Sequence, residues 1–95
     1  MQTIFRSDLI RSLAGRDQGK LFYVLETEGA YALIVNGKER KLEHPKRKKL
    51  KHICFVTRTE SRVAEKLRTG AKVLDRELRR DLAIQAGALC QDQGG

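Results

Sequence analysis

Short apolar segments separated by turn-forming residues fill the sequence between residues 8 and 56, and this spacing limits the folds that the chain can adopt. The segments are too short for stable helices, and they are rich in aliphatic, aromatic and β-branched residues. We therefore expect β-strands joined by tight turns. The expected strands cover residues 8–13, 21–26, 31–35, 39–43 and 50–56.

The turn-forming residues between these segments indicate how the strands connect. Gly15 and Gly19 mark the first turn. Asn36-Gly37 is the dipeptide that best tolerates two consecutive positive φ angles, so it predicts a hairpin turn. Pro45 lacks an amide donor and is expected to end the fourth strand. Five short strands connected in this way predict a small closed or half-closed barrel.

From Thr59 the apolar residues recur at helical spacing, and we expect two short amphipathic α-helices. Thr59 or Ser61 can cap the first helix, and Gly70 is a break or a stop. Asp75 is the expected N-cap of the second helix, and Gly87 is its expected end. The predicted chain is mainly β, with a five-stranded barrel over residues 1–57, a helical tail over 58–90 and a disordered end over 91–95.

The positive charge of the chain is concentrated in about one quarter of its length. The whole sequence has a net charge of +8, and residues 36–58 alone carry nine basic side chains against two acidic ones, a net charge of +7. A charge that serves only solubility is spread over the chain, whereas a focused charge attracts a polyanion. The run HPKRKKLKHI, residues 44–53, holds five of the nine, and nucleic-acid phosphate is its expected partner.

The stretch SLAGRDQGKLFYVLETEGAYALIVNG, residues 12–37, resembles a KOW motif. Its most specific part is Ala14-Gly15, followed by Arg16-Asp17, by Gly19-Lys20 and by an apolar strand. Together with the basic run, the chain resembles the short bacterial KOW-domain RNA-binding proteins that are similar to archaeal and eukaryotic large-subunit ribosomal proteins. The resemblance covers about the first 56 residues. It implies an SH3-like barrel that contacts RNA, ribosomal RNA in particular, with the loops around the motif.

The residues themselves also indicate an RNA-binding site. Gly19 lies where a strand begins after a turn, and a phosphate near that turn would meet Arg16, Lys20 and open backbone amides. We expect this turn and the basic loop after Pro45 to lie close together and to form one cationic surface. The expected RNA-binding residues are Arg16, Lys20, Lys38, Arg40, Lys46, Arg47, Lys48, Lys49 and Lys51. The expected structural turn residues are Gly15, Gly19, Asn36 and Gly37.

Two questions stay open at the level of sequence. Phosphate contacts do not report the sugar, so the choice of RNA over DNA depends on the resemblance. Tyr23 and Tyr31 could stack on unpaired bases or pack within the sheet. A loop rich in lysine suits backbone recognition better than base recognition, so we expect little sequence specificity.

Metal binding and catalysis have little support in the sequence. His44, His52, Cys54 and Cys90 form no CxxC or HxxxH pair, so we expect no metal, no cofactor and reduced thiols. No Walker or dinucleotide-binding loop is present, and no nucleophile has a recognisable base and orienting group. We therefore do not expect an enzyme.

The main alternative is a protein-interaction adaptor of the translation or transcription machinery. In this hypothesis the barrel docks on a ribosomal or transcription protein, and the helical tail binds a second partner. The supporting feature is an apolar face that is either packed or free, formed by Val63, Leu67, Leu78 and Leu82.

The remaining expectations concern location and assembly. The longest apolar run, residues 30–35, is far too short to cross a bilayer. We therefore expect a cytoplasmic protein without a membrane anchor, and most simply a monomer.

Overall fold

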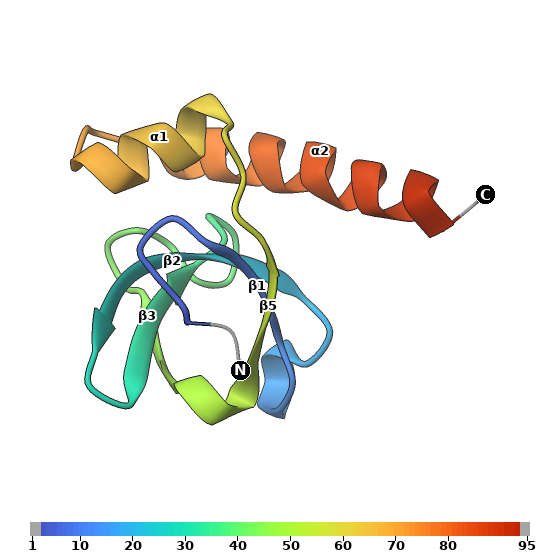
Figure 1. Ribbon diagram of the computed structural model, residues 1–95. Coiled ribbons are helices and arrows are strands. Elements are labelled where there is room, and N and C mark those ends of the chain that lie inside the picture. Colours follow the sequence, from blue (N-terminus) through green and yellow to red (C-terminus); the bar gives the residue numbers. More distant parts are fainter. Residues whose placement is uncertain (1–2, 94–95) are drawn as a thin grey trace.

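The computed structural model describes residues 3–93 as a five-stranded antiparallel sheet with two helices (Figure 1). The sheet has the strand order β4-β3-β2-β1-β5. Its strands are β1 (Leu9–Ser12), β2 (Leu21–Glu28), β3 (Tyr31–Val35), β4 (Lys46–Lys49) and β5 (Ile53–Thr57). The short 3-10 helices η1 (Gly15–Asp17) and η2 (Leu50–His52) precede β2 and β5. The α-helices are α1 (Arg62–Thr69) and α2 (Asp75–Gln93).

The first three predicted strands are confirmed, the fourth is wrong, and the fifth is confirmed from Ile53 onwards, because residues 50–52 form η2. Residues 39–43 belong to a loop, and the strand that pairs with β3 begins after Pro45, inside the basic run. Its register places Lys46 opposite Ile34 and Lys48 opposite Ala32. A run of lysines is tolerated in this strand because β4 is an edge strand, where charged side chains also discourage pairing with other chains. The expected basic loop is therefore largely a strand.

Asn36 organises the loop of residues 36–45. Its side-chain Oδ1 accepts hydrogen bonds from the amides of Lys38 at 3.0 Å and Arg40 at 2.9 Å. Of the Asn36-Gly37 pair, only Gly37 has a positive φ, at 77°. The predicted two-residue hairpin turn is therefore wrong, and the dipeptide instead begins a longer loop that reaches the helices.

One face of the sheet packs against both helices. Leu9, Tyr23 and Val35 of the sheet share a buried cluster with side chains of α1 and α2. The apolar face of the helical tail belongs to this cluster, because Val63, Leu67, Leu78 and Leu82 are all at most 8% exposed. The packed interpretation of that face is confirmed, so it is not a free binding surface.

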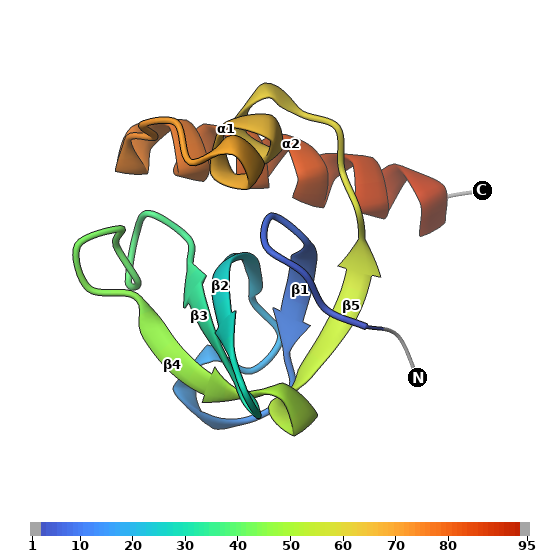
Figure 2. The ribbon, with the colours of Figure 1, turned by 60° about the vertical axis from the view of Figure 1, so that its left-hand side comes forward.

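The other face of the sheet encloses a second core. The sheet curls so that its two edges approach the same side (Figure 2), and Phe22, lying on this side, is fully buried. Across the described strands β4 and β5 do not pair, so the sheet is not closed. The second core consists of Ile10, Phe22, Val24, Ala32, Ile34 and Ile53.

The first helix follows the sequence prediction, and the second exceeds it. Ser61 caps α1 by accepting a hydrogen bond from the amide of Ala64 at 3.2 Å, and Gly70 ends the helix with a φ of 80°. Gly87 lies inside α2 and does not end it, because a single interior glycine costs only about 1 kcal/mol relative to alanine. The predicted disordered end is helical up to Gln93, and residues 94–95 lie outside the described range. The chain is therefore mixed α/β and not mainly β.

Tyr23 connects the sheet to the helices. Its side chain is fully buried, and its hydroxyl donates a hydrogen bond to Asp81 Oδ2 at 3.1 Å. Ser61 Oγ donates to the same carboxylate oxygen at 2.6 Å. The packing interpretation of Tyr23 is thus confirmed, because a fully buried ring is not available to stack on a base.

We expect the protein to lose stability at high pH because of Tyr23. Burial raises the pKa of Tyr23 from 10.0 to about 12. The unfolded chain therefore loses this proton at a lower pH than the folded chain, so the stabilisation is complete below pH 10 and is lost as the pH rises towards 12. Urea denaturation on both sides of pH 10 measures the loss. Tyr23→Phe is the control, since it keeps the other titrating groups; parallel pH curves for the two proteins would contradict the assignment.

Candidate nucleic-acid interface

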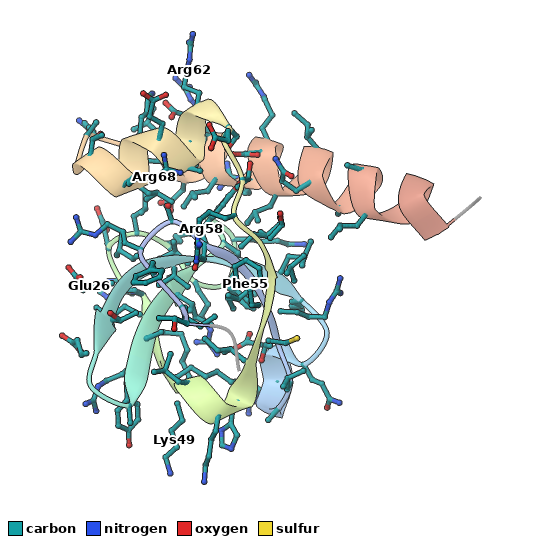
Figure 3. All side chains as sticks on the ribbon, viewed as in Figure 1. Glu26, Lys49, Phe55, Arg58, Arg62 and Arg68 are labelled. Carbon is teal, nitrogen blue, oxygen red and sulfur yellow. The ribbon has the colours of Figure 1, made fainter. Side chains whose placement is uncertain are left out.

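The end of the sheet opposite the helices gathers basic side chains from two distant segments. One segment is η1, which carries Arg16. The other runs from β4 into η2 and carries Arg47, Lys49 and Lys51, and Figure 3 shows Lys49 pointing away from the helices. All four side chains belong to exposed residues. We call Arg16, Arg47, Lys49 and Lys51 the basal surface.

Two hydrogen bonds hold these segments together. The amide of Leu13 donates to the carbonyl oxygen of His52 at 2.8 Å. Lys48 Nζ donates to the carbonyl oxygen of Ala14 at 2.5 Å. The expected proximity of the first turn and the basic run is therefore confirmed, and Lys48 is one of the residues that produce it.

Lys48 is buried, although it lies in a run of basic residues that the sequence predicts to be exposed. It is only 8% exposed, whereas its neighbours Arg47 and Lys49 are exposed. Alternation along β4 turns Lys48 towards the concave side of the sheet, where its amine reaches across to the connection between β1 and β2. In the folded protein its amine is thus engaged by Ala14 and is not presented to a ligand.

The basal cations differ in how far they are neutralised by acidic groups. Arg47 Nε lies 3.7 Å from Glu28 Oε1, and its guanidinium stacks over the ring of Tyr31 at 3.9 Å. Among the described side chains, those of residues 3–89, Arg16, Lys49 and Lys51 have no acidic partner at ion-pairing distance. Three exposed and uncompensated cations at one end of the sheet create a local positive potential that favours a polyanion.

Three other predicted site residues lie away from the basal surface. Lys20 Nζ pairs with Glu39 Oε1 at 3.1 Å, and this hydrogen bond lowers the pKa of Glu39. Lys38 Nζ lies 3.9 Å from the other oxygen of Glu39. Arg40 donates from Nε and Nη2 to the buried carboxylate of Asp17 at 3.2 and 3.0 Å. Arg40 therefore fixes the loop of residues 36–45 to η1.

Lys46 and the turn glycines are the remaining residues of the predicted site. Lys46 is half-buried and points to the same side of β4 as Lys48. Gly15 and Gly19 have positive φ angles of 76° and 87°, as the predicted turn requires. Gly37 has a different function, because its Cα approaches the backbone of Asp75 closely.

A second cationic region was not predicted from the sequence. A groove of about 680 Å³ lies between the β1–β2 connection, residues 36–39 and residues 79–89 of α2. Arg11 and Arg79 line it together with Lys20 and Lys38. Arg11 and Arg79 are distant in sequence and belong to no charge run, so only the crossing of α2 over the sheet brings them together.

The cysteine and histidine side chains show no arrangement typical of a metal site. The part of the chain that the structure describes contains no cluster of three or more His, Cys, Asp or Glu side chains able to hold a metal. Cys54 is a free, exposed thiol, and the side chain of Cys90 lies outside the described part. Among residues 3–93, no helix has the length and apolar character needed to span a membrane.

Comparison with known proteins finds neither a family model that matches this chain nor a curated protein with significant similarity to it.

Proposed function

We propose that this protein binds RNA through the basal surface, as a ribosome-associated protein with an SH3-like KOW barrel. The observation that carries the proposal is the convergence of Arg16, Lys49 and Lys51, which are exposed, uncompensated by acids and supplied by two distant segments. The KOW-like stretch supplies Arg16, and the basic run supplies the two lysines. The two sequence features that suggest RNA binding thus contribute to the same surface.

The geometry favours contact with the phosphate backbone. Basal lysines and arginines extend from a strand and from two 3-10 helices, and all four belong to exposed residues. Cations on such a surface contact phosphates and carry little sequence information. The curled five-stranded sheet, with η2 between its two edge strands, supports the SH3-like assignment.

The salt dependence of RNA affinity tests this proposal. If the four basal cations each neutralise one phosphate of a duplex, the logarithm of affinity falls against the logarithm of salt concentration with a slope of about −3 to −4. Fluorescence anisotropy with a labelled ribosomal RNA hairpin gives the slope, and a DNA hairpin of the same sequence measures preference for RNA. A slope close to zero would exclude the electrostatic mechanism.

Sedimentation of cell lysate tests the ribosomal part of the proposal separately. We expect the protein to migrate with the large ribosomal subunit at low salt and to leave it as salt rises. A protein that stays in the light fractions at every salt concentration would contradict ribosome association and leave the RNA affinity measurement unaffected.

A further inference from the structure

The groove beneath residues 79–89 of α2 combines positive charge with an apolar floor. Leu82, Ala86 and Leu89 of α2 line one side, and Leu21 of β2 lines the other. The C-terminal part of α2 extends beyond the edge of the sheet (Figures 1 and 2), and its Ala86 and Leu89 line the groove together with Arg11 of β1 and Leu21 of β2. Each of Leu21, Ala86 and Leu89 is half-buried and keeps surface that a ligand can cover.

The charges that line the groove are strongly unequal. Arg11, Lys20, Lys38 and Arg79 are basic, and Glu39 is the one acidic side chain in the lining. Arg79 Nη1 donates to the carbonyl oxygen of Gly37 at 2.6 Å, and Arg11 Nη1 donates to that of Gly19 at 2.9 Å. Each guanidinium is held by a neutral acceptor, so its charge is uncompensated and its remaining N–H groups are available to carboxylates.

We propose that this groove binds a short segment of a partner protein in which acidic side chains flank an aliphatic one. Carboxylates complement the basic rim, and an aliphatic side chain removes the half-buried Leu21 and Leu89 from water. A nucleic-acid strand fits less well, since its phosphates offer nothing to the apolar floor and the lining contains no aromatic side chain for base stacking. The groove is open to solvent and is not an enclosed cavity, which suits a segment of protein chain better than a small molecule.

This inference goes beyond the proposed RNA function and does not depend on it. The groove and the basal surface share no residue, because none of Arg16, Arg47, Lys49 and Lys51 lines the groove. We therefore expect the protein to bind its partner segment and RNA at the same time. This can be tested by titrating the partner segment into the protein–RNA complex, and RNA into the complex of the protein with the partner segment.

NMR titration of the full chain with synthetic peptides tests the proposal. The probe is a short peptide in which glutamates flank two leucines, and a second peptide carries serine in place of leucine. We expect the leucine peptide to shift the amide signals of Gly19, Leu21 and Asn36, with or without bound RNA hairpin. The serine peptide is expected to bind about tenfold more weakly, which corresponds to the loss of buried leucine surface.

Matched variants on α2 locate the site. Arg79→Gln and Leu89→Ser remove groove side chains, and we expect each to weaken leucine-peptide binding about tenfold. Arg80→Gln and Ile84→Ser make the same kinds of change at exposed positions of α2 outside the groove, and neither is expected to alter binding. The amide spectra also report whether each variant keeps its fold.

Three results would overturn the proposal. The first is equal affinity for the leucine and serine peptides, which would reduce the interaction to charge attraction alone. The second is a set of shifted amides outside the groove. The third is an RNA hairpin that shifts the groove amides when the leucine peptide does not, which would assign the groove to nucleic acid.

Discussion

Replacing Arg16, Lys49 and Lys51 together by glutamine is expected to lower RNA affinity about 100-fold or more near physiological salt. Each residue is exposed and lacks an acidic partner among the side chains of residues 3–89, so we expect its replacement to remove a phosphate contact and leave the fold intact. Removing three contacts also reduces the steepness of the salt dependence by about 2 to 3 units of slope. Anisotropy titrations with the ribosomal RNA hairpin measure both effects.

The control for this variant makes the same change in net charge elsewhere. Arg62, Lys72 and Arg76 are exposed on and between the helices, and their replacement by glutamine also removes three positive charges. Figure 3 shows Arg62 pointing away from the sheet, on the side opposite Lys49. We expect this second triple variant to change affinity only slightly. An equal loss in both variants would show that net charge, and not the basal surface, controls binding.

Substitutions at the adjacent residues Lys48 and Lys49 are expected to have different effects, the first on stability and the second on RNA binding. Lys48→Met removes the hydrogen bond to Ala14, and we expect the free energy of unfolding to fall by about 1.5 to 3 kcal/mol. Lys49→Met removes an exposed charge, and we expect it to weaken RNA binding without a loss of stability. Charge reversal of the whole run of residues 46–49 would combine both effects, so loss of binding by such a variant would not identify a contact.

Replacing Gly37 by alanine is expected to lower the free energy of unfolding by between about 2 and 5 kcal/mol. The φ angle of 77° disfavours any residue with a Cβ by about 1 to 2 kcal/mol. A Cβ at this position would also overlap the carbonyl oxygen of Asp75 and lie 3.0 Å from Leu78 Cβ. Relief of this overlap requires the start of α2 to move away from the loop, which adds about 1 to 3 kcal/mol. Urea denaturation measures the total.

Gly29→Ala is the matched control for this substitution. Gly29 also has a positive φ, at 59°, but a Cβ there would have no atom within 4 Å. Its replacement therefore carries only the backbone strain, about 1 to 2 kcal/mol. Equal losses at the two positions would contradict the close contact between Gly37 and α2.

The features that the sequence predicted well depend on neighbouring residues. Gly15 and Gly19 adopt the positive φ angles of a turn, and Ser61 and Gly70 delimit α1 as their capping chemistry requires. Such preferences act within a few residues, so they are visible without knowledge of the fold. The proximity of the first turn to the basic run was a hypothesis at this stage, and the hydrogen bond from Lys48 to Ala14 confirms it.

The features that the sequence did not predict depend on distant partners. The position of β4 is set by its pairing with β3, and nothing near Pro45 indicates that the strand begins after it. The sequence does not distinguish Lys48 from Arg47 and Lys49, because only the curled sheet places its amine at Ala14. Gly37 was assigned to a hairpin turn, yet its lack of a side chain also makes room for Asp75, which is remote in sequence.

The sequence by itself determined where most strands lie, where α1 begins and ends, and that a focused positive charge is available for a polyanion. Only the tertiary structure decided which of the basic residues remain free to act on it. Arg40 is held by Asp17, Lys48 by Ala14 and Lys20 by Glu39. Arg16, Lys49 and Lys51 stay exposed and have no acidic partner among the side chains of residues 3–89. The reason is physical: a charge is a property of one side chain, but its neutralisation depends on the groups that folding brings within a few ångströms of it.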